Sequence, residues 1–346
     1  MISPNPLVST SVMASMFLCL ASAVEAAPLF ESHDILEVRI EAPFRTLAKV
    51  RSDEEYLDGA LSYTGADGKQ YSFDLKVRAR GRYRRQKTTC DFPPVRLNFR
   101  TQQLEGSEFE GQDKLKLVSY CKKRTRFEQL VLREYLAYRI LQVLTDRSFG
   151  VRLLHITYVD TDRDGELLTK YGFIIEDEDD VGERIGLTSL ETTGLDYDDL
   201  DARHANLISM YQYLIGNTDF SLIRGPADDD CCHNSVPFSD GQLVTPVPYD
   251  FDFSGLVNAP YAEPNPRFKI RSVRTRVYRG RCSNNSVLPN TIEHIAGRKA
   301  VIYALLDDTP DLDKKNRAEV TRYLDSFFAE VGDPDQVERN FIKECS

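Results

Sequence analysis

The sequence predicts an α+β chain with a strand-rich first half and a helix-rich second half. In the first half, short runs alternate apolar and polar residues, as half-buried strands do. In the second half, apolar residues recur every three or four positions, as on helices that bury one face. Hydrophobic residues make up 41% of the 346 residues and charged residues 28%, which is enough apolar material for a folded core.

Six segments of the first half have the strand pattern and one has the helix pattern. The alternating runs predict strands over 36–40, 75–80, 95–99, 114–118, 153–159 and 167–175. Apolar residues at helical spacing predict one helix over 126–144.

The turn between the last two of these strands contains Asp160, Asp162, Asp164 and Gly165, which resemble the start of a calcium loop. Such a loop needs a glutamate at its twelfth position, and that position is Tyr171. We therefore expect a polar hairpin turn here.

The second half begins with a predicted helix over 198–215, which ends at a glycine typical of helix termini, Gly216. A turn over 239–241 predicts a hairpin whose second strand covers 242–249. Further helices are expected over 291–306 and 314–331. We place the boundary between the halves near 177–186, which gives parts 27–176 and 177–346.

The N-terminus has the pattern of a secretory signal peptide. The apolar run 12–23 is too short to cross a membrane comfortably and is followed by Val24-Glu25-Ala26, a small-x-small pattern. We expect a signal peptide over 1–26, cleaved after Ala26, and a secreted or periplasmic protein. A buried N-terminal helix is the alternative. No later run is long enough for a membrane span, so we expect no span in the mature chain.

Cysteine usage agrees with export. Cys19 would leave with the signal peptide, and an even number remains, which predicts three disulfides. We expect Cys90 to pair with Cys121, and Cys282 to pair with one of two adjacent cysteines. An alternative is that Cys231-Cys232-His233 are metal ligands. The six remaining cysteines are Cys90, Cys121, Cys231, Cys232, Cys282 and Cys345.

Charge argues against one class of partner and suggests another. The net charge is −10, so nucleic acid is not the expected partner. Four arginines nevertheless alternate around Gly81, and guanidinium groups bind phosphate oxygens in pairs; a solvated strand face is the alternative. A second basic run covers 267–281. The four arginines around the glycine are Arg78, Arg80, Arg82 and Arg84.

Acidic and amide residues of the second half come in an order typical of phosphoryl transfer. Asp219 follows a predicted helix, Asn234 opens the predicted hairpin, and Asp250 and Asp252 follow its second strand. Phosphoryl transfer uses one carboxylate to orient the acceptor hydroxyl, then an amide and a further carboxylate to hold Mg²⁺. In a protein kinase these groups come in the same order. Each residue alone is more often structural than catalytic.

These motifs resemble those of the CotH kinase family, which are secreted or spore-coat proteins. The resemblance covers about residues 75 to 260. It implies an atypical two-lobed protein-kinase-like fold, with a strand-rich N-lobe and a helix-rich C-lobe. The matching pieces are Arg80-Gly81, the strand 93–99, the helix 134–138, the loop from Asn217-x-Asp219 to His233-Asn234, and the run 248–252.

The resemblance also implies roles. Asp219 would be the catalytic aspartate, with Asn234, Asp250 and Asp252 as metal ligands for ATP with Mg²⁺ or Mn²⁺. Lys116 would bind phosphates and Glu134 would be its helix partner, with Lys114 as the rival lysine. No Gly-x-Gly-x-x-Gly loop is present, so Arg80 and Arg82 would take its place. Glu176-Asp177 would lie near an adenine. The acceptor would be a protein of unknown identity.

Two other functions fit parts of the sequence. A glycosidase could use Asp219 and Asp250 as acid and base, although the chain has no Trp to form a sugar platform. A non-catalytic pseudokinase or binding module could keep the same residues without turnover. Motifs of zinc proteases, serine hydrolases and P-loop proteins are absent from the sequence.

Overall fold

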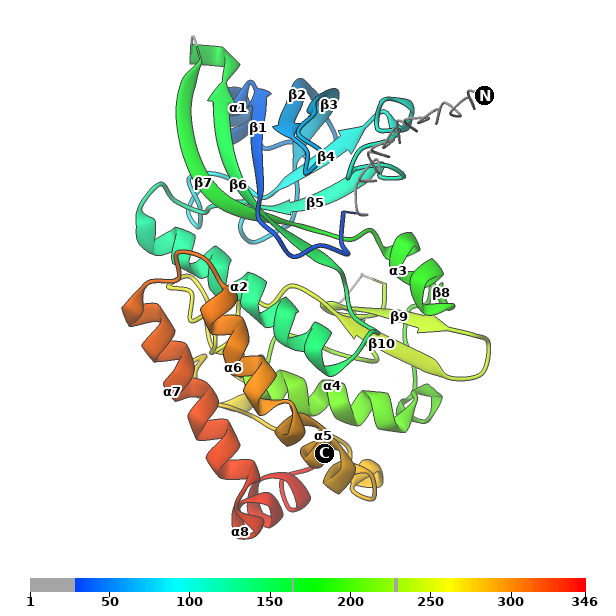
Figure 1. Cartoon of the computed structure of the whole chain (residues 1–346). Coiled ribbons are helices and arrows are strands. Elements are labelled where there is room, and N and C mark those ends of the chain that lie inside the picture. Colours follow the sequence, from blue (N-terminus) through cyan, green and yellow to red (C-terminus); the bar gives the residue numbers. More distant parts are fainter. Residues whose placement is uncertain (1–28, 164, 227–229) are drawn as a thin grey trace, which may run out of the picture.

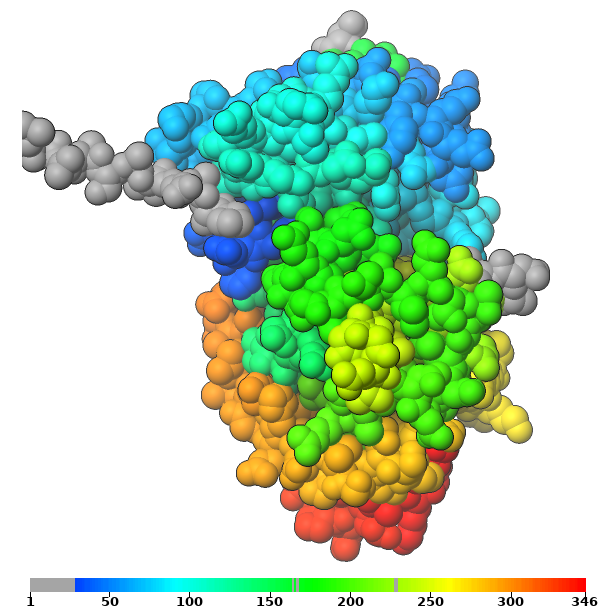
Figure 2. Space-filling model, turned by 90° about the vertical axis from the view of Figure 1, so that its right-hand side faces the viewer, coloured from blue at the N-terminus to red at the C-terminus, as the bar shows by residue number. Residues whose placement is uncertain are grey.

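The computed structural model describes residues 29–163, 165–226 and 230–346. The predicted signal peptide, its cleavage site and Cys19 lie outside these residues. Seven strands gather at one end of the molecule and most helices at the other (Figure 1). A side view shows the same division, with the first strands of the chain in blue to cyan and the last helices in orange to red (Figure 2).

The seven strands of the first half form a closed barrel, in the order β1-β2-β3-β4-β5-β7-β6. Neighbouring strands are antiparallel except β1 and β6, whose parallel pairing runs from Leu36↔Leu154 to Ala42↔Asp160 and closes the barrel. The strands are β1 (Leu36–Ala42), β2 (Leu57–Thr64), β3 (Gln70–Ala79), β4 (Val95–Phe99), β5 (Lys114–Val118), β6 (Val151–Asp160) and β7 (Glu166–Ile175).

The prediction of a two-lobed protein-kinase-like fold is wrong. The strands do not form an open sheet of an N-lobe, because β1 pairs with β6 and closes them into a barrel. The six strands predicted for the first half are found at their predicted places, whereas β2 was not predicted. Their closure depends on a pairing between segments more than a hundred residues apart, which alternation within one strand does not reveal.

The two faces of strands β6 and β7 serve two different cores. Ile174 of β7 points into the barrel, while Phe173 and Ile175 on either side of it belong to the core shared with the helices. This is the alternation of a pleated strand buried on both faces. At Gly172 a Cβ atom would lie 2.8 Å from Ile156 Cδ1, so only glycine fits there without a shift.

The helices and a small sheet complete the chain. A three-stranded sheet has the order β10-β9-β8. In the described residues, no helix is both long enough and apolar enough to cross a membrane. The bounds are α1 (Phe44–Val50), α2 (Thr125–Leu144), α3 (Glu178–Ile185), α4 (Ala202–Ile215), α5 (Leu288–Gly297), α6 (Lys299–Asp308), α7 (Lys314–Val331), α8 (Pro334–Val337), β8 (Thr188–Ser189), β9 (Ser235–Ser239) and β10 (Val244–Pro248).

Helix α2 links the barrel to the helices. Leu132, Leu136 and Ile140 are fully buried in a core that also contains Phe173 of β7 and Leu214 of α4. Figure 1 shows α2 between the barrel and helices α4, α6 and α7. The predicted division at residue 176 coincides with the end of the barrel but stays a prediction, because α2 shares its core with the second half.

Several predicted elements are confirmed and several were missed. The strands over 95–99 and 114–118 and the helix over 314–331 agree in both limits. The turn after Asp160 is a hairpin between β6 and β7, as expected. Asp160 and Asp162 accept hydrogen bonds from the backbone N–H groups of Arg45 and Thr46 at the start of α1. Helices α1 and α3 were not expected from the sequence.

Three disulfides join the six cysteines of the described chain, as predicted. The pair Cys90–Cys121 is confirmed. The expected bond from Cys282 to one of the adjacent cysteines is wrong, because Cys282 pairs with Cys345, and Cys231 with Cys232. The chain end brings Cys345 to Cys282: the Ser346 backbone N–H donates to the Gly280 carbonyl, 2.9 Å away. Three disulfides are typical of exported proteins.

Candidate functional site

The β9–β10 hairpin brings two of the predicted residues together. Its strands are antiparallel, and Ser235 at the start of β9 pairs with Pro248 at the end of β10. Asn234 and Asp250 therefore both lie just outside the same open end. The Tyr249 N–H donates to the Asn234 carbonyl at 3.0 Å. Both residues have positive φ, 52° and 61°, a conformation that asparagine and aspartate tolerate better than most residues.

Asp219 reaches the same place from the end of α4. The helix stops at Gly216, whose φ is 66°, and a Cβ there would meet the Tyr323 hydroxyl at 1.9 Å. The chain then turns through Asn217, whose Oδ1 accepts the Asp219 N–H at 2.9 Å. The predicted helix end is thus confirmed, and the turn after it fixes the Asp219 backbone.

The carboxylate of Asp219 is held from two sides. His233 Nε2 lies 2.8 Å from Asp219 Oδ1. Asn234 Nδ2 donates to the Asp219 carbonyl at 2.7 Å and to its Oδ2 at 3.2 Å. The hydrogen bond to Asp219 raises the pKa of His233, so the imidazole keeps its proton to higher pH. A carboxylate oxygen has two lone pairs, so each oxygen of Asp219 can still accept another hydrogen bond.

The side-chain carboxylate of Asp250 has no hydrogen-bond or ion-pair partner among the described residues. Its backbone N–H donates to the hydroxyl of Tyr138 on α2, at 2.8 Å. Its side-chain oxygens make no hydrogen bond or ion pair within the described residues, and the residue is exposed. Protein surrounds the carboxyl group closely enough that desolvation raises its pKa, against the opposing effects of Arg80 and Arg84.

Asp252, two residues further on, is buried. Its side chain is inside the protein, where the Tyr261 hydroxyl donates to its Oδ2 at 3.0 Å. Burial, reinforced by the charge of Asp250, raises the pKa of Asp252 to about 7. The two aspartates therefore differ in kind: Asp250 is accessible to a ligand, whereas Asp252 is enclosed.

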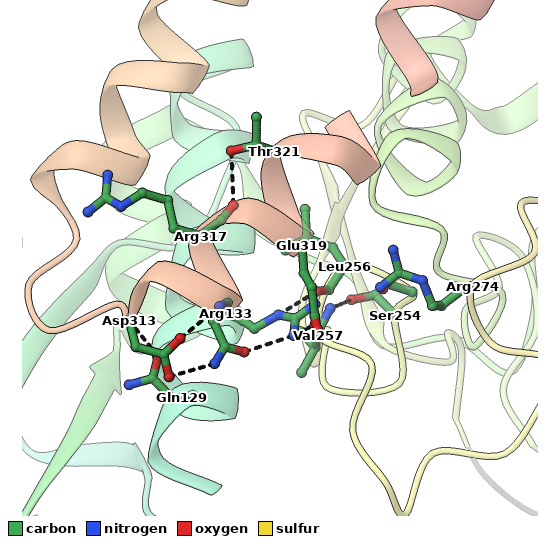
Figure 3. A network of polar contacts seen from close by, with 12 residues as sticks. Gln129, Arg133, Ser254, Leu256, Val257, Arg274, Asp313, Arg317, Glu319 and Thr321 are labelled. Atoms are coloured by element: carbon green, nitrogen blue, oxygen red, sulfur yellow. Dashed lines mark hydrogen bonds and ion pairs between the residues drawn. The ribbon is translucent and has the colours of Figure 1, made fainter. Parts of the chain in front are cut away.

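A buried arginine fixes the segment that follows Asp252. Arg133 of α2 donates from Nε to the Leu256 carbonyl at 2.8 Å, and its Nη1 lies 3.3 Å from Glu319 Oε2 of α7. Figure 3 shows this network between α2, α7 and the loop containing Ser254 and Val257. Burial lowers the pKa of Arg133 to about 10. The loop is thereby attached to two helices.

Two arginines of the predicted comb face the aspartates. Arg84 is buried, and its Nη1 lies 3.6 Å from Glu134 Oε2 of α2. Its Nη2 also donates to the Ser119 carbonyl. Arg80 makes no side-chain hydrogen bond or ion pair in the described chain, and its Nε is buried without a partner. Desolvation lowers the pKa of Arg80, and the charge of Asp250 is the largest opposing effect.

Lys116 lies beside the same group. It is half-buried on β5, with its Nζ 5.3 Å from the ring centre of Tyr249, the residue before Asp250. Burial, followed by the charge of Arg80, lowers its pKa. It forms no ion pair with any described residue. The rival Lys114 is exposed and pairs with its neighbour Asp113 at 3.0 Å, so of the two lysines only Lys116 belongs to the site.

The charges within this group are only partly paired. Four carboxyl groups, from Asp219, Glu134, Asp250 and Asp252, lie in this group with the cations Arg80, Arg84 and Lys116 and with His233, and of the four only Asp219 and Glu134 are in ion pairs within the described residues. Desolvation, followed by the charge of Asp252, raises the pKa of Glu134 well above its usual value. A retained proton or a bound cation would relieve the repulsion between the unpaired carboxyl groups Asp250 and Asp252.

The donors fit one kind of metal site and not another. Within the described residues, no three His, Cys, Asp or Glu side chains are arranged to hold a metal ion. Mg²⁺, however, is often bound by one or two carboxylates together with substrate phosphates. The free carboxylate of Asp250 and the side-chain oxygen of Asn234 suit that arrangement. These residues fit a cation completed by phosphate oxygens, and not one held by protein alone.

Most of the predicted site residues come together, with one change of partner. Asp219 and Asn234 are in contact. The charge of Asp219 acts on Asp250 and Asp252, Asp250 acts on Arg80, and Arg80 acts on Lys116. Glu134 pairs with Arg84, so its expected role as the partner of Lys116 is not what the structure has. Arg82, two residues after Arg80 and directly after Gly81, is exposed.

The predicted link between the halves is tied into the fold. Glu176 pairs with Arg184 at 2.7 Å and accepts the Gly150 N–H at 2.6 Å. Asp177 caps α3 by accepting from the Asp179 N–H. Both carboxylates thus have structural partners. Whether an adenine lies nearby stays a prediction.

Four residues of the site were not assigned roles from the sequence. His233 stood within the motif Cys231-Cys232-His233, where it was weighed only as a metal ligand. Arg84 was one of four alternating arginines, and alternation alone does not say which is buried. Tyr138 and Tyr261 had no role predicted for their hydroxyls, because neither the tyrosine that accepts from the Asp250 N–H nor the one that donates to Asp252 has a spacing of its own.

Two cavities lie away from this site. One, of about 410 Å³, is lined by Asp58, Lys76 and Asn98 of strands β2, β3 and β4, among others. The other, of about 590 Å³, lies where α2 ends and α4 begins, beside His294 of α5. Neither contains a predicted site residue.

Comparison with known proteins adds no family. No protein-family model matches this chain, and no curated protein matches its sequence. The resemblance to the CotH kinase family therefore rests on the quoted motifs and stays a prediction.

Proposed function

We propose that this chain is an exported phosphotransferase, which transfers phosphate from a nucleoside triphosphate to a hydroxyl group of a protein with the help of Mg²⁺ or Mn²⁺. Export would follow cleavage of the signal peptide after Ala26, to the periplasm or the outside of the cell. The proposal concerns the site and its chemistry, and it does not depend on a kinase-like fold.

One observation supports this proposal above all. Asp250 has an accessible carboxylate, and Arg80 is the cation that acts on it most strongly. The Nζ of Lys116 lies 5.3 Å from the ring centre of Tyr249, the residue before Asp250, and none of the three forms an ion pair within the described chain. A ligand with both signs would satisfy all three: a divalent cation for the aspartate, and phosphate oxygens for the arginine and the lysine.

Each residue would have its own task. Asp250, with the Asn234 amide oxygen, would hold a divalent cation, which supplies charge neutralisation between the phosphates. Arg80 and Lys116 would bind phosphate oxygens directly. Asp219 would accept the hydrogen bond of the incoming hydroxyl and align it for in-line attack. The hydrogen bonds from His233 and Asn234 would keep the Asp219 carboxylate in that orientation.

Glu134 and Arg84 would act through position rather than contact. Their buried ion pair joins α2 to the loop that carries Arg80. Since Glu134 is occupied by Arg84, Lys116 has no carboxylate partner on α2 and keeps its charge for the phosphates. The corrected pairing therefore strengthens the assignment of Lys116 as a phosphate ligand.

The test is a phosphate-transfer assay beside nucleotide-dependent thermal stabilisation. Wild type should be stabilised by ATP with Mn²⁺ and should transfer radiolabelled phosphate to a protein acceptor. Asp219→Asn should keep the stabilisation, because it leaves the nucleotide ligands intact, and should transfer about 10³-fold more slowly. Asp308→Asn, an equal change at an exposed position of α6, is the control and should behave as wild type.

Two results would count against the proposal. If ATP fails to stabilise wild type both in the presence of Mg²⁺ and in the presence of Mn²⁺, the site does not bind nucleotide. If wild type is stabilised but transfers no phosphate to any acceptor, the chain is a nucleotide-binding module without turnover.

A further inference from the structure

The basic run near the end of the chain has no part in the site described above. The segment 265–281 contains seven Lys or Arg residues and no Asp or Glu, in a chain whose net charge is −10. This cluster of positive charge in a chain with negative net charge indicates a structural or functional role. Burial and contacts divide the seven cations into two groups.

Four of the seven cations hold the segment in place. Arg276 donates to the carbonyls of Leu214 and Tyr323. The others stack over aromatic rings: Arg274 lies 4.6 Å from the ring centre of Tyr323, Arg279 lies 4.2 Å from that of Phe220, and Arg281 lies 4.3 Å from that of Tyr197.

The other three cations face solvent. Arg267, Lys269 and Arg271 are exposed, and none of them forms an ion pair with a described residue. We call these three residues the basic patch. Apart from the Arg267 guanidinium, which lies 5.9 Å from the ring centre of the neighbouring Phe268, their charged groups have no hydrogen-bond or ion-pair partner within the described chain and are available to a ligand.

The basic patch is anchored to both neighbours of Asp219. Asn265 Nδ2 donates to the Thr218 carbonyl at 3.2 Å, and Arg279 Nη1 donates to the Phe220 carbonyl. Phe268, which lies between Arg267 and Lys269 in the sequence, has its ring centre 5.1 Å from the Arg279 guanidinium. One residue separates Arg267 from Asn265, so their Cα atoms are at most about 7 Å apart.

We infer that the basic patch binds the acceptor, and that the acceptor is a protein segment with acidic residues close to its reacting hydroxyl. The inference rests on the proposed function, because it takes Asp219 as the residue that receives that hydroxyl. A hydroxyl at Asp219 would bring its flanking residues next to the patch. Glutamate or aspartate at those positions would complement three unpaired cations, and lysine or arginine would be repelled.

The test is peptide binding measured by fluorescence anisotropy, without nucleotide or metal. Three short peptides would carry one serine flanked by glutamate, by glutamine or by lysine. Wild type should bind the glutamate peptide about tenfold more tightly than the glutamine peptide, with the difference shrinking as salt is raised. The lysine peptide should bind most weakly.

Charge reversal identifies the surface responsible. A variant with Arg267→Glu, Lys269→Glu and Arg271→Glu should lose the preference for the glutamate peptide. The control reverses three other exposed cations that form no ion pair with described residues, Arg45, Lys76 and Arg322. It changes the net charge by the same amount and should keep the preference.

The outcomes separate this inference from the proposed function. If wild type prefers the glutamate peptide but transfers no phosphate, the inference about the basic patch is supported and the proposed activity is contradicted. Transfer with equal binding of all three peptides would overturn the patch. If both triple variants lost the preference for the glutamate peptide, net charge alone would explain that preference. This result would also overturn the inference about the basic patch. So would binding of anionic vesicles through the patch by a protein that shows no peptide preference.

Discussion

In the barrel, hydrophobic side chains from all seven strands meet in one core, whereas the candidate site gathers four carboxyl groups and two arginines. Of these charged residues, Glu134, Asp252 and Arg84 are buried. Buried charges usually work against folding unless they are fully paired. The barrel core therefore stabilises the fold, while the site leaves Arg80, Lys116 and Asp250 without an ion pair among the described residues. Perturbed carboxyl groups of this kind cluster at functional sites.

Substitution inside the barrel should have the largest effect on stability. Leu97 of β4 is fully buried, so Leu97→Ala should lower the free energy of unfolding by about 3 kcal/mol, through lost burial and the cavity left behind. Urea denaturation measures the change. Asn98→Ala, on the opposite face of the same strand, should change stability by less than about 0.5 kcal/mol. Equal losses for the two variants would contradict the description of the barrel core.

Removal of the arginine behind the site should have a smaller effect. Arg133→Met keeps the apolar stem but leaves the Leu256 carbonyl without its donor. We expect the free energy of unfolding to fall by about 2 kcal/mol, because Glu319 is partly exposed and can be hydrated. Nucleotide-dependent stabilisation should weaken as well, since the loop after Asp252 loses its attachment. An Arg133→Met protein as stable as wild type would contradict the role given to this network.

The sequence predicted the barrel strands better than their pairing. Alternation places β4 and β5 at their observed limits, because each strand buries one face in the barrel. The parallel pairing of β1 with β6 has no local signature. It follows from how the strands in between twist and close.

The site shows the same limit. The predicted hairpin explains why Asn234 and Asp250 lie at the same end of it, whereas the position of Asp219 depends on the turn that follows α4. The partner of Glu134 was not predictable. It depends on the path of the loop after β3, which the Cys90–Cys121 disulfide and the hydrogen bond from Arg84 to the Ser119 carbonyl hold against the end of β5.

A substitution at the site should have the opposite sign to one in the barrel. Asp252→Asn removes a buried charge while its amide oxygen can still accept from Tyr261. The raised pKa means that the folded state favours the protonated carboxyl, so wild type loses stability as pH rises from about 4 to about 7. Asp252→Asn should therefore be more stable than wild type by about 1 kcal/mol at pH of about 8, and less so at about pH 5.

Urea denaturation at the two pH values measures this difference. If Asp252→Asn is less stable than wild type at the higher pH, the charge of Asp252 does not oppose folding. The contrast between barrel and site would then fail.

The smallest effect is expected at His233. Its raised pKa means that the ion pair with Asp219 stabilises the fold fully below the unfolded pKa of about 6.5 and is lost as pH rises through the folded value. The pair is about a third exposed, so His233→Gln should cost less than about 1 kcal/mol. The loss should be larger at pH of about 6 than at about 9. The same urea experiment detects it, and a loss independent of pH would show that the charge is irrelevant.

The most direct test of the candidate site is a calorimetric titration of wild type and Asp250→Ala with ATP, with and without Mn²⁺. Because Asp250 is the accessible, unpaired carboxylate of the site and Arg80 is the cation that acts on it most strongly, we expect wild type to bind ATP tightly only when the metal is present. We expect Asp250→Ala to lose that metal-dependent binding. Wild-type protein that binds no ATP with the metal, or an Asp250→Ala variant that binds as wild type does, would contradict the assignment of this site.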